Sequence, residues 1–242
     1  MVKSHPDRME KIIKDWMFDL NLVDLCDNTA SDGLHIWFPR DKKVDKVSEI
    51  TSLSTEDTNM AVEAYRKGGA SLYFGAPPEF REAWCKRLAC HLGMNFSAYF
   101  PNFTSRSEIE IFASRKGNYT NFHMDFQENF TVQLKGRKTW RVVKSGYPSP
   151  LRGFTPHYKH SGNLEEQLKI IYQTCQLEYD EKFLLDNCEE LVLEEGDILY
   201  HPAGIWHAVE CDEDSIAINF SLRNLNMSDM IGNGLRHVMN AD

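Results

Sequence analysis

From Ser97 onward, short runs rich in apolar and β-branched residues predict that strands dominate the chain. A first group of expected strands covers Ser107–Ser114, Phe122–Phe126, Asn129–Leu134 and Thr139–Lys144. A second group covers Leu191–Leu193, Asp197–His201, His207–Glu210 and Ile216–Leu222. Two groups of strands joined by one longer segment indicate the two halves of a jelly roll, in which the strands form a barrel.

The N-terminal third shows helical periodicity instead. Helices are expected over Asp7–Leu20, between Ser54 and Gly69, and from Pro77 onward, with short strands at Leu34–Phe38 and Ala70–Phe74. Ser54 and Asp57 resemble a capping box at the start of the second helix, and the pair Gly68-Gly69 ends it. We expect these N-terminal helices to pack outside the barrel.

We expect one domain over residues 1–242, with N-terminal support over 1–95, a jelly-roll core over 96–225 and a last helix over 226–242. An insert over 146–187, with a helix capped by Asn163, separates the two strand groups. The insert is expected near the barrel mouth, where loops often select substrates. Gly232 and Gly234 each weaken the last helix by about 1 kcal/mol relative to alanine. This helix is therefore expected to need a packing partner, either the barrel or a second subunit.

The residues with the clearest chemistry are His123 and Asp125, two positions apart, and His207 in a later expected strand. Residues i and i+2 of a strand project to the same side, so His123 and Asp125 are expected to face one site together. Two histidines and one carboxylate form a set that holds non-haem Fe(II) and leaves coordination positions open. An H-x-D sequence alone also arises by chance, so the surrounding residues must support the metal site.

The surrounding residues resemble those of a known family. The run from Gly196 to His207 reads G-D-x-L-Y-x-P-x-G-x-x-H, and the run from Gln133 to Trp140 reads Q-L-x-G-x-K-x-W. In their order and spacing these runs are similar to the JmjC-type, cupin-fold oxygenases that use Fe(II), 2-oxoglutarate and O2. Within that family the ribosomal oxygenases and the asparaginyl hydroxylase of the hypoxia response are the most similar. The resemblance extends from about Gly69 to Arg223.

The resemblance implies roles for individual residues. His123, Asp125 and His207 are the implied iron ligands, and Lys138, fifteen positions after His123, is the implied anchor for the distal carboxylate of 2-oxoglutarate. Three further residues match positions near the metal or the cosubstrate in the asparaginyl hydroxylase: Thr120, Asn129 and Asn219.

The chain departs from the ribosomal oxygenases at one position. They carry a 2-oxoglutarate-binding tyrosine on the strand before H-x-D, whereas this stretch reads Glu110-Ile111-Phe112. Either another hydroxyl replaces that tyrosine, or Thr120 and Lys138 suffice. His201 lies close to the second motif and is interpreted as a packing or supporting residue, not as a ligand.

Composition narrows the classes of partner. A formal net charge of −9 argues against general nucleic-acid binding, which requires basic patches. The sequence contains no apolar run long enough for a transmembrane helix, so no membrane association is expected. Six scattered cysteines without a C-x-x-C pair favour free thiols in a reducing, cytoplasmic setting.

We therefore expect an Fe(II)- and 2-oxoglutarate-dependent hydroxylase that acts on an amino-acid side chain in a peptide or protein, with a homodimer as one possible assembly. One alternative is an oxygenase of a free amino acid or a peptide natural product. A second is a cupin that binds a ligand without catalysis, and the intact triad together with Lys138 argues against it. The sequence leaves the substrate and the hydroxylated atom undetermined.

Overall fold

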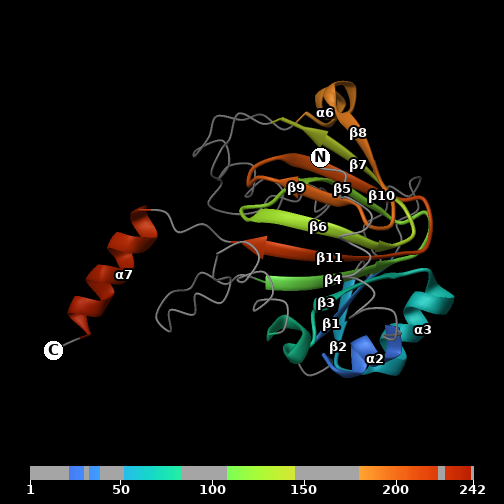
Figure 1. Ribbon diagram of the computed structural model, residues 1–242, viewed down its shortest axis with the longest axis horizontal. Coiled ribbons are helices and arrows are strands. Elements are labelled where there is room, and N and C mark those ends of the chain that lie inside the picture. Colours follow the sequence, from blue (N-terminus) through green and yellow to red (C-terminus); the bar gives the residue numbers. More distant parts are fainter. Residues whose placement is uncertain are drawn as a thin grey trace.

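A computed structural model of the chain describes residues 22–29, 33–38, 52–82, 108–144, 180–222 and 227–240. Within these residues two antiparallel sheets face each other (Figure 1). The larger sheet has the strand order β2-β1-β3-β4-β11-β6-β9, and the smaller has the order β5-β10-β7-β8. This arrangement is the jelly-roll barrel that the two groups of expected strands predicted, and strands are the main element of the described residues.

Apart from β2, the described strands lie close to their predicted positions. In the larger sheet they are β1 (Leu34–Trp37), β2 (Ser52–Thr55), β3 (Ser71–Gly75), β4 (Glu108–Ser114), β6 (Glu128–Lys135), β9 (Ile198–His201) and β11 (Ser215–Leu222). In the smaller sheet they are β5 (Tyr119–Met124), β7 (Lys138–Val143), β8 (Glu189–Leu193) and β10 (Trp206–Cys211). The helices that lie wholly within the described residues are α2 (Leu22–Asp27), α3 (Thr58–Gly68), α6 (Glu181–Asn187) and α7 (Met227–Met239). Residues 78–82 are also helical, where a helix from Pro77 onward was predicted.

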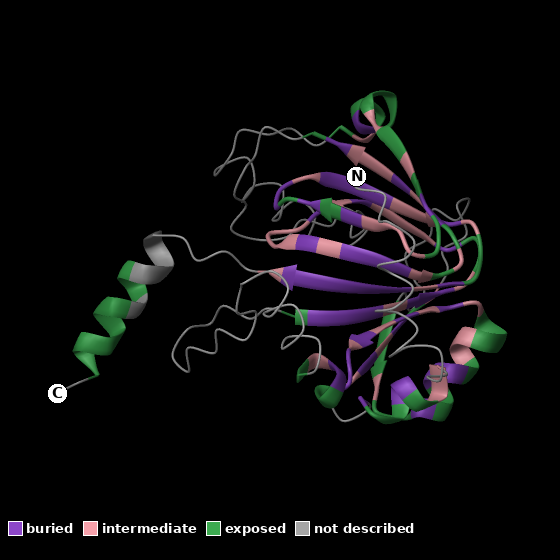
Figure 2. Ribbon diagram, viewed as in Figure 1, coloured by how far each residue is buried: buried purple, intermediate pink, exposed green. Residues whose placement is uncertain are grey.

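The main hydrophobic core lies on the outer face of the larger sheet, not inside the barrel. Leu72 and Phe74 on β3, Ile111 on β4 and Ile218 on β11 form one buried cluster with residues of α2 and α3 (Figure 2). The alternate residues of the same strands therefore face the barrel interior. Many of these are polar, and they surround a cavity between the two sheets. The N-terminal helices described here pack outside the barrel, as predicted.

The structure corrects the expected start of α3 and adds elements that the pattern did not predict. Asp57 alone caps this helix, because its carboxylate accepts hydrogen bonds from the backbone N–H groups of Asn59 and Met60. Ser54 lies instead in β2 and contacts His35, so the interpretation as a capping box was wrong. The strand β2 and the helices α2 and α6 were not predicted.

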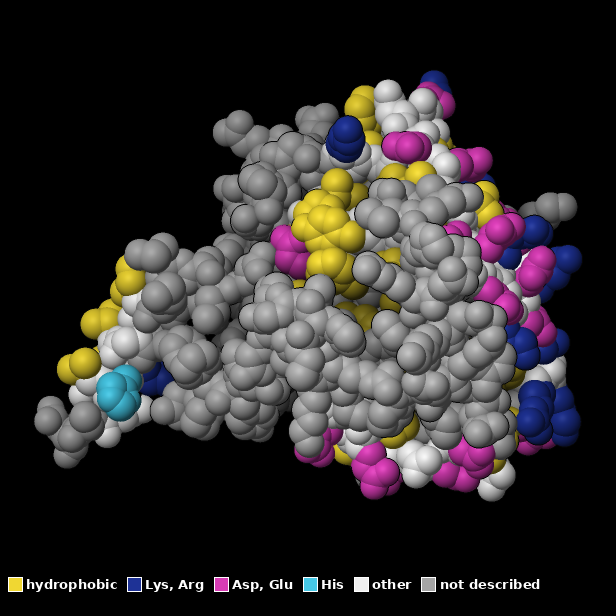
Figure 3. All heavy atoms as spheres, viewed as in Figure 1, with side chains coloured by type: hydrophobic (Ala, Val, Ile, Leu, Met, Phe, Trp, Pro, Cys, Tyr) yellow, Lys and Arg dark blue, Asp and Glu magenta, His cyan; other side chains and the backbone are white. Residues whose placement is uncertain are grey.

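Several predictions fall outside the described residues. They concern the helix over Asp7–Leu20, the helix capped by Asn163 and the insert up to residue 179. The final helix was predicted correctly, and it exposes Ile231, Leu235 and Val238 along one side (Figure 3). Among the described helices, none combines the length and the apolar character that crossing a bilayer requires.

Candidate metal and cosubstrate site

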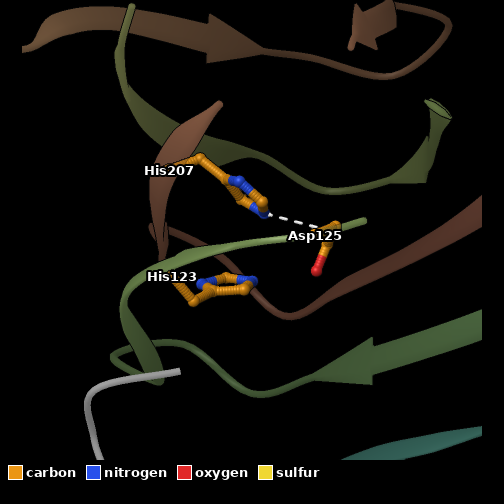
Figure 4. Close-up of side chains that lie close together, drawn as sticks. All are labelled: His123, Asp125 and His207. Atoms are coloured by element: carbon orange, nitrogen blue, oxygen red, sulfur yellow. Dashed lines mark ion pairs between the residues drawn. The ribbon is translucent and has the colours of Figure 1, made fainter. Parts of the chain in front are cut away.

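His123, Asp125 and His207 meet at one end of the cavity between the sheets. One potential ligand atom from each residue lies within 4.8 Å of the other two (Figure 4). His123 and His207 are directly opposite each other on the hydrogen-bonded strands β5 and β10, with ring centroids 4.0 Å apart. Asp125 follows the last residue of β5, and its Oδ2 atom lies 3.6 Å from Nε2 of His207. The triad thus arises from two adjacent strands, although 84 positions of sequence separate the two histidines.

Backbone carbonyl groups orient both imidazole rings. Nδ1 of His123 lies 2.8 Å from the carbonyl oxygen of Asn121, and Nδ1 of His207 lies 3.1 Å from that of Ile205. A carbonyl oxygen only accepts hydrogen bonds, so each Nδ1 carries the hydrogen and each Nε2 keeps a lone pair for a metal. Burial, followed by the neighbouring His123 and His201, lowers the pKa of His207 well below its usual value. A neutral ring is the form that binds a metal.

A β-bulge brings Thr120 into the same cavity as His123. Two steps along β10, from His207 to Val209, correspond to three steps along β5, from His123 to Thr120. In a regular strand, residues three apart face opposite sides, and the extra residue of a bulge reverses that relation. Thr120 therefore lines the cavity together with the triad.

Lys138 is a buried lysine that forms no ion pair with any acidic residue in the described part of the chain. It begins β7, is 5% exposed and lines the same cavity as the triad. Among the described residues that line this cavity it is the only lysine or arginine, and no described residue forms a hydrogen bond or ion pair with its ammonium group. Desolvation lowers the pKa of Lys138. A buried ammonium without a partner is costly, so this position suits an anionic ligand group.

Asn129 and Asn219 belong to a hydrogen-bonded network beside the metal site. Nδ2 of Asn129 donates to Oδ2 of Asp125 at 3.0 Å, and Nδ2 of Asn219 donates to Oδ1 of Asn129 at 2.9 Å. Asn219 lines the cavity, whereas Asn129 lies one layer behind it and holds the carboxylate of Asp125. The geometry thus gives Asn129 a direct contact with the candidate metal ligand.

The network continues to residues that sequence reasoning missed. Glu110 on β4 accepts hydrogen bonds from Ser221 and Asn219 on β11 and from the hydroxyl of Tyr73 on β3. Desolvation raises the pKa of Glu110, and the hydrogen bond from Tyr73 is the largest effect in the opposite direction. The single hydroxyl hydrogen of Tyr73 is donated to Glu110, so Tyr73 cannot also donate it to a bound carboxylate. In the sequence, the only signal for these residues is strand alternation, which places them on the inward faces of neighbouring strands.

His201 and Trp140 pack against the outer side of His207. Their ring centroids lie 4.5 Å and 5.5 Å from that of His207, and Trp140 is stacked on it. Both rings line the cavity and help to fix the plane of the imidazole. The interpretation of His201 as a supporting residue therefore agrees with its position.

Comparisons with known proteins agree with this fold. The family model described as "JmjC domain" matches residues 91–230. Protein YxbC of Bacillus subtilis is 25% identical over 211 residues, covering 84% of this chain and 58% of YxbC. Ribosomal oxygenase 1 of Rattus norvegicus is 31% identical over 100 residues, covering 41% of this chain and 14% of that protein. The chain therefore spans only part of the length of these relatives.

A solved structure supports the fold independently. The ribosomal oxygenase YcfD of Escherichia coli, in complex with cobalt and 2-oxoglutarate, superimposes with a TM-score of 0.53 at 16% identity. That alignment covers 100% of this chain and 50% of YcfD. At this identity the similarity shows a shared fold. Because the family model covers more than half of the chain, and the two-sheet barrel agrees with it, this protein belongs to the JmjC-domain family.

Proposed function

We propose that this protein is an Fe(II)- and 2-oxoglutarate-dependent hydroxylase. The observation that carries the proposal is the position of two complementary groups in one cavity. A triad of two imidazoles and a carboxylate is a donor set for Fe(II), and a buried ammonium that no described residue pairs with is a partner for a carboxylate. The similar protein YcfD was solved in complex with cobalt and 2-oxoglutarate.

Each residue has a separate task in this proposal. His123, Asp125 and His207 hold the metal on one face and leave the other face open to ligands. Lys138 pairs with the distal carboxylate of 2-oxoglutarate, and Thr120 supplies a hydroxyl in the same cavity. When bound, Fe(II), 2-oxoglutarate and O2 supply an oxidative decarboxylation that yields succinate and CO2 and places one oxygen atom in a substrate C–H bond.

We propose an amino-acid side chain in a peptide or protein as the substrate. The relatives named ribosomal oxygenase favour this class. In this chain a row of aromatic residues, Trp37, Tyr73 and Phe112, forms one wall of the cavity. Their ring centroids are separated by 6.1 Å and 5.0 Å, which gives a rigid apolar wall on which a side chain can lie.

Mass spectrometry tests this function directly. Candidate peptides are incubated with the protein, Fe(II), 2-oxoglutarate and O2, and a product one oxygen atom heavier is expected. His207→Ala is the matched control, since it lacks one ligand of the proposed metal site. If Fe(II) and 2-oxoglutarate bind but no succinate forms with any peptide or amino acid tested, the protein is a binding module and the proposal fails.

The assembly and the cellular setting belong to the same proposal. We propose a cytoplasmic protein, because the three described cysteines, Cys26, Cys188 and Cys211, are free thiols. We also propose a homodimer in which the exposed apolar side of α7, formed by Ile231, Leu235 and Val238, meets its symmetry copy. Light scattering during size-exclusion chromatography measures the mass, and a monomer at every concentration would exclude this arrangement.

A further inference from the structure

Glu110 is a buried carboxylate in the barrel interior that the proposed reaction does not require. It is 8% exposed, and no lysine or arginine among the described residues forms an ion pair with it. Three donors converge on it instead. Oε2 accepts from Oγ of Ser221 at 2.9 Å and from Nδ2 of Asn219 at 3.3 Å, and Oε1 accepts from the hydroxyl of Tyr73. Burying a carboxylate costs free energy, so we expect the hydrogen bonds that Glu110 accepts to have a role in the protein.

The hydrogen bonds between Glu110 and the metal site have a defined direction. Thr131 has only its hydroxyl hydrogen to give, and Oδ1 of Asn219 receives it at 2.9 Å. The amide nitrogen of Asn219 must therefore face Oδ1 of Asn129, 2.9 Å away. That contact turns Nδ2 of Asn129 toward Oδ2 of Asp125, at 3.0 Å. If the Asn129 amide were reversed, its oxygen would face a carboxylate oxygen and repel it.

Ser221 is the link that makes Glu110 part of this arrangement. Oε2 of Glu110 accepts the single hydroxyl hydrogen of Ser221 at 2.9 Å, and the Ser221 oxygen in turn accepts from Nδ2 of Asn219 at 2.9 Å. Oδ1 of Asn129, 2.8 Å from the same oxygen, cannot receive that hydrogen at the same time, so Asn219 is the donor that holds Asn129. An apolar residue at this position would leave the hydroxyl free to rotate and would remove one acceptor from the Asn219 amide.

We propose that Glu110 is a positioning residue for the metal site. It fixes Ser221 and Asn219, Asn219 fixes the amide of Asn129, and that amide fixes the carboxylate of Asp125. The inference rests on the proposed function because it takes Asp125 as a metal ligand. The residue acts at a distance, through three strands of the larger sheet, and does not touch the metal or the substrate.

The first test measures Co(II) binding in the presence of 2-oxoglutarate for the wild type, Glu110→Leu and Glu110→Gln. Loss of a hydrogen-bond partner behind a metal ligand typically weakens metal binding about 10–100-fold. For Glu110→Leu we expect a loss of about tenfold, at the lower end of that range, together with an altered visible spectrum of the bound Co(II). For Glu110→Gln we expect affinity within about threefold of wild type, since its amide oxygen still accepts from Ser221 and Asn219. Wild-type affinity in Glu110→Leu, or equal loss in both variants, overturns the proposal.

The second test asks whether Glu110 acts through Asn129. Two residues in one hydrogen-bonded network give non-additive effects. The double variant Glu110→Leu/Asn129→Ala should therefore bind Co(II) about as weakly as Asn129→Ala alone. A loss equal to the product of the two single losses would mean that Glu110 acts by another route, and this result overturns the proposal.

Controls separate positioning from a general loss of stability. Thr29→Val removes a buried hydroxyl that donates to the carbonyl of Leu25, outside the barrel, so it should lower the melting temperature without changing Co(II) affinity or spectrum. If Glu110→Leu does not fold, Ser221→Ala carries the same test, and wild-type affinity in that variant overturns the proposal. Equal Co(II) binding by wild type and His207→Ala would instead refute the proposed function itself.

Discussion

Replacing Lys138 with methionine should preserve or raise the stability of the metal-free protein but weaken its affinity for 2-oxoglutarate. Methionine keeps the length of the side chain and removes its charge. In the metal-free protein Lys138 is 5% exposed and has no hydrogen-bonding or ionic partner among the described residues, and burial lowers its pKa. Folding must therefore desolvate this ammonium or remove its proton, and both cost free energy. Lys138→Met is thus expected to leave the melting temperature unchanged or to raise it.

The loss in cosubstrate affinity should be large. Breaking a buried ion pair by removal of one partner typically costs about 3–5 kcal/mol, because the other charge stays buried without compensation. At about 1.4 kcal/mol per factor of ten, this corresponds to a loss on the order of 10²–10³-fold. No other lysine or arginine among the described lining residues can replace Lys138. Metal affinity should change little, since the triad keeps its three ligands.

Isothermal titration calorimetry under anaerobic conditions measures both affinities, and thermal melts with and without 2-oxoglutarate measure the stability. Lys135→Met is the matched control, because Lys135 is an exposed lysine at the end of β6, the strand that precedes β7 in the chain. In the wild type and the control, 2-oxoglutarate should raise the melting temperature. A 2-oxoglutarate affinity within about threefold of wild type in Lys138→Met would show that another group binds the distal carboxylate, and the reasoning from burial would be refuted.

Three further predictions concern the metal ligands, pH and a turn. His207→Ala should abolish Fe(II) binding and turnover, because it removes one of three ligands; wild-type iron stoichiometry in this variant would contradict the site. Acidification below about pH 6.5 should destabilise the metal-free protein, because burial lowers the pKa of His207 and of His201 while the unfolded chain binds protons near 6.5. Thermal melts across this range should show a falling melting temperature, and a flat profile would contradict the burial of neutral rings. Gly136→Ala should cost more than the roughly 1–2 kcal/mol of a left-handed residue, because its Cβ would lie 2.2 Å from the carbonyl oxygen of Asp214. Gly117→Ala has a similar φ but no atom within 4 Å, so urea unfolding should show the smaller loss there, and equal losses would contradict the clash.

The strands of the barrel and the triad could be predicted because their signals are local. Alternation of apolar and polar residues indicates the strands β4 to β7 and β8 to β11. His123 and Asp125 lie within three consecutive residues, so their spacing is also a local signal. One prediction at the N-terminal end failed for a physical reason. Ser54 was assigned to a cap because serine favours both caps and turns, whereas its pairing with His35 in β1 places it in a strand. Pairing of this kind depends on a partner strand, which the local sequence does not specify.

The sequence by itself determined the chemical groups: two imidazoles, a carboxylate and a lysine at fixed spacing, on a chain of short strands. Tertiary structure decided where these groups point and what holds them. A bulge in β5 turns Thr120 inward, and pairing of β11 with β4 and β6 brings Glu110, Asn129 and Asn219 into one network. Alternation shows that a strand has two faces, but only the packed helices show which face is the core. Asn129, which donates to Asp125, is only four positions away, but the hydrogen bonds that orient Asn129 join residues about 90–110 positions apart, and loop closure over such distances leaves no local signal in the sequence.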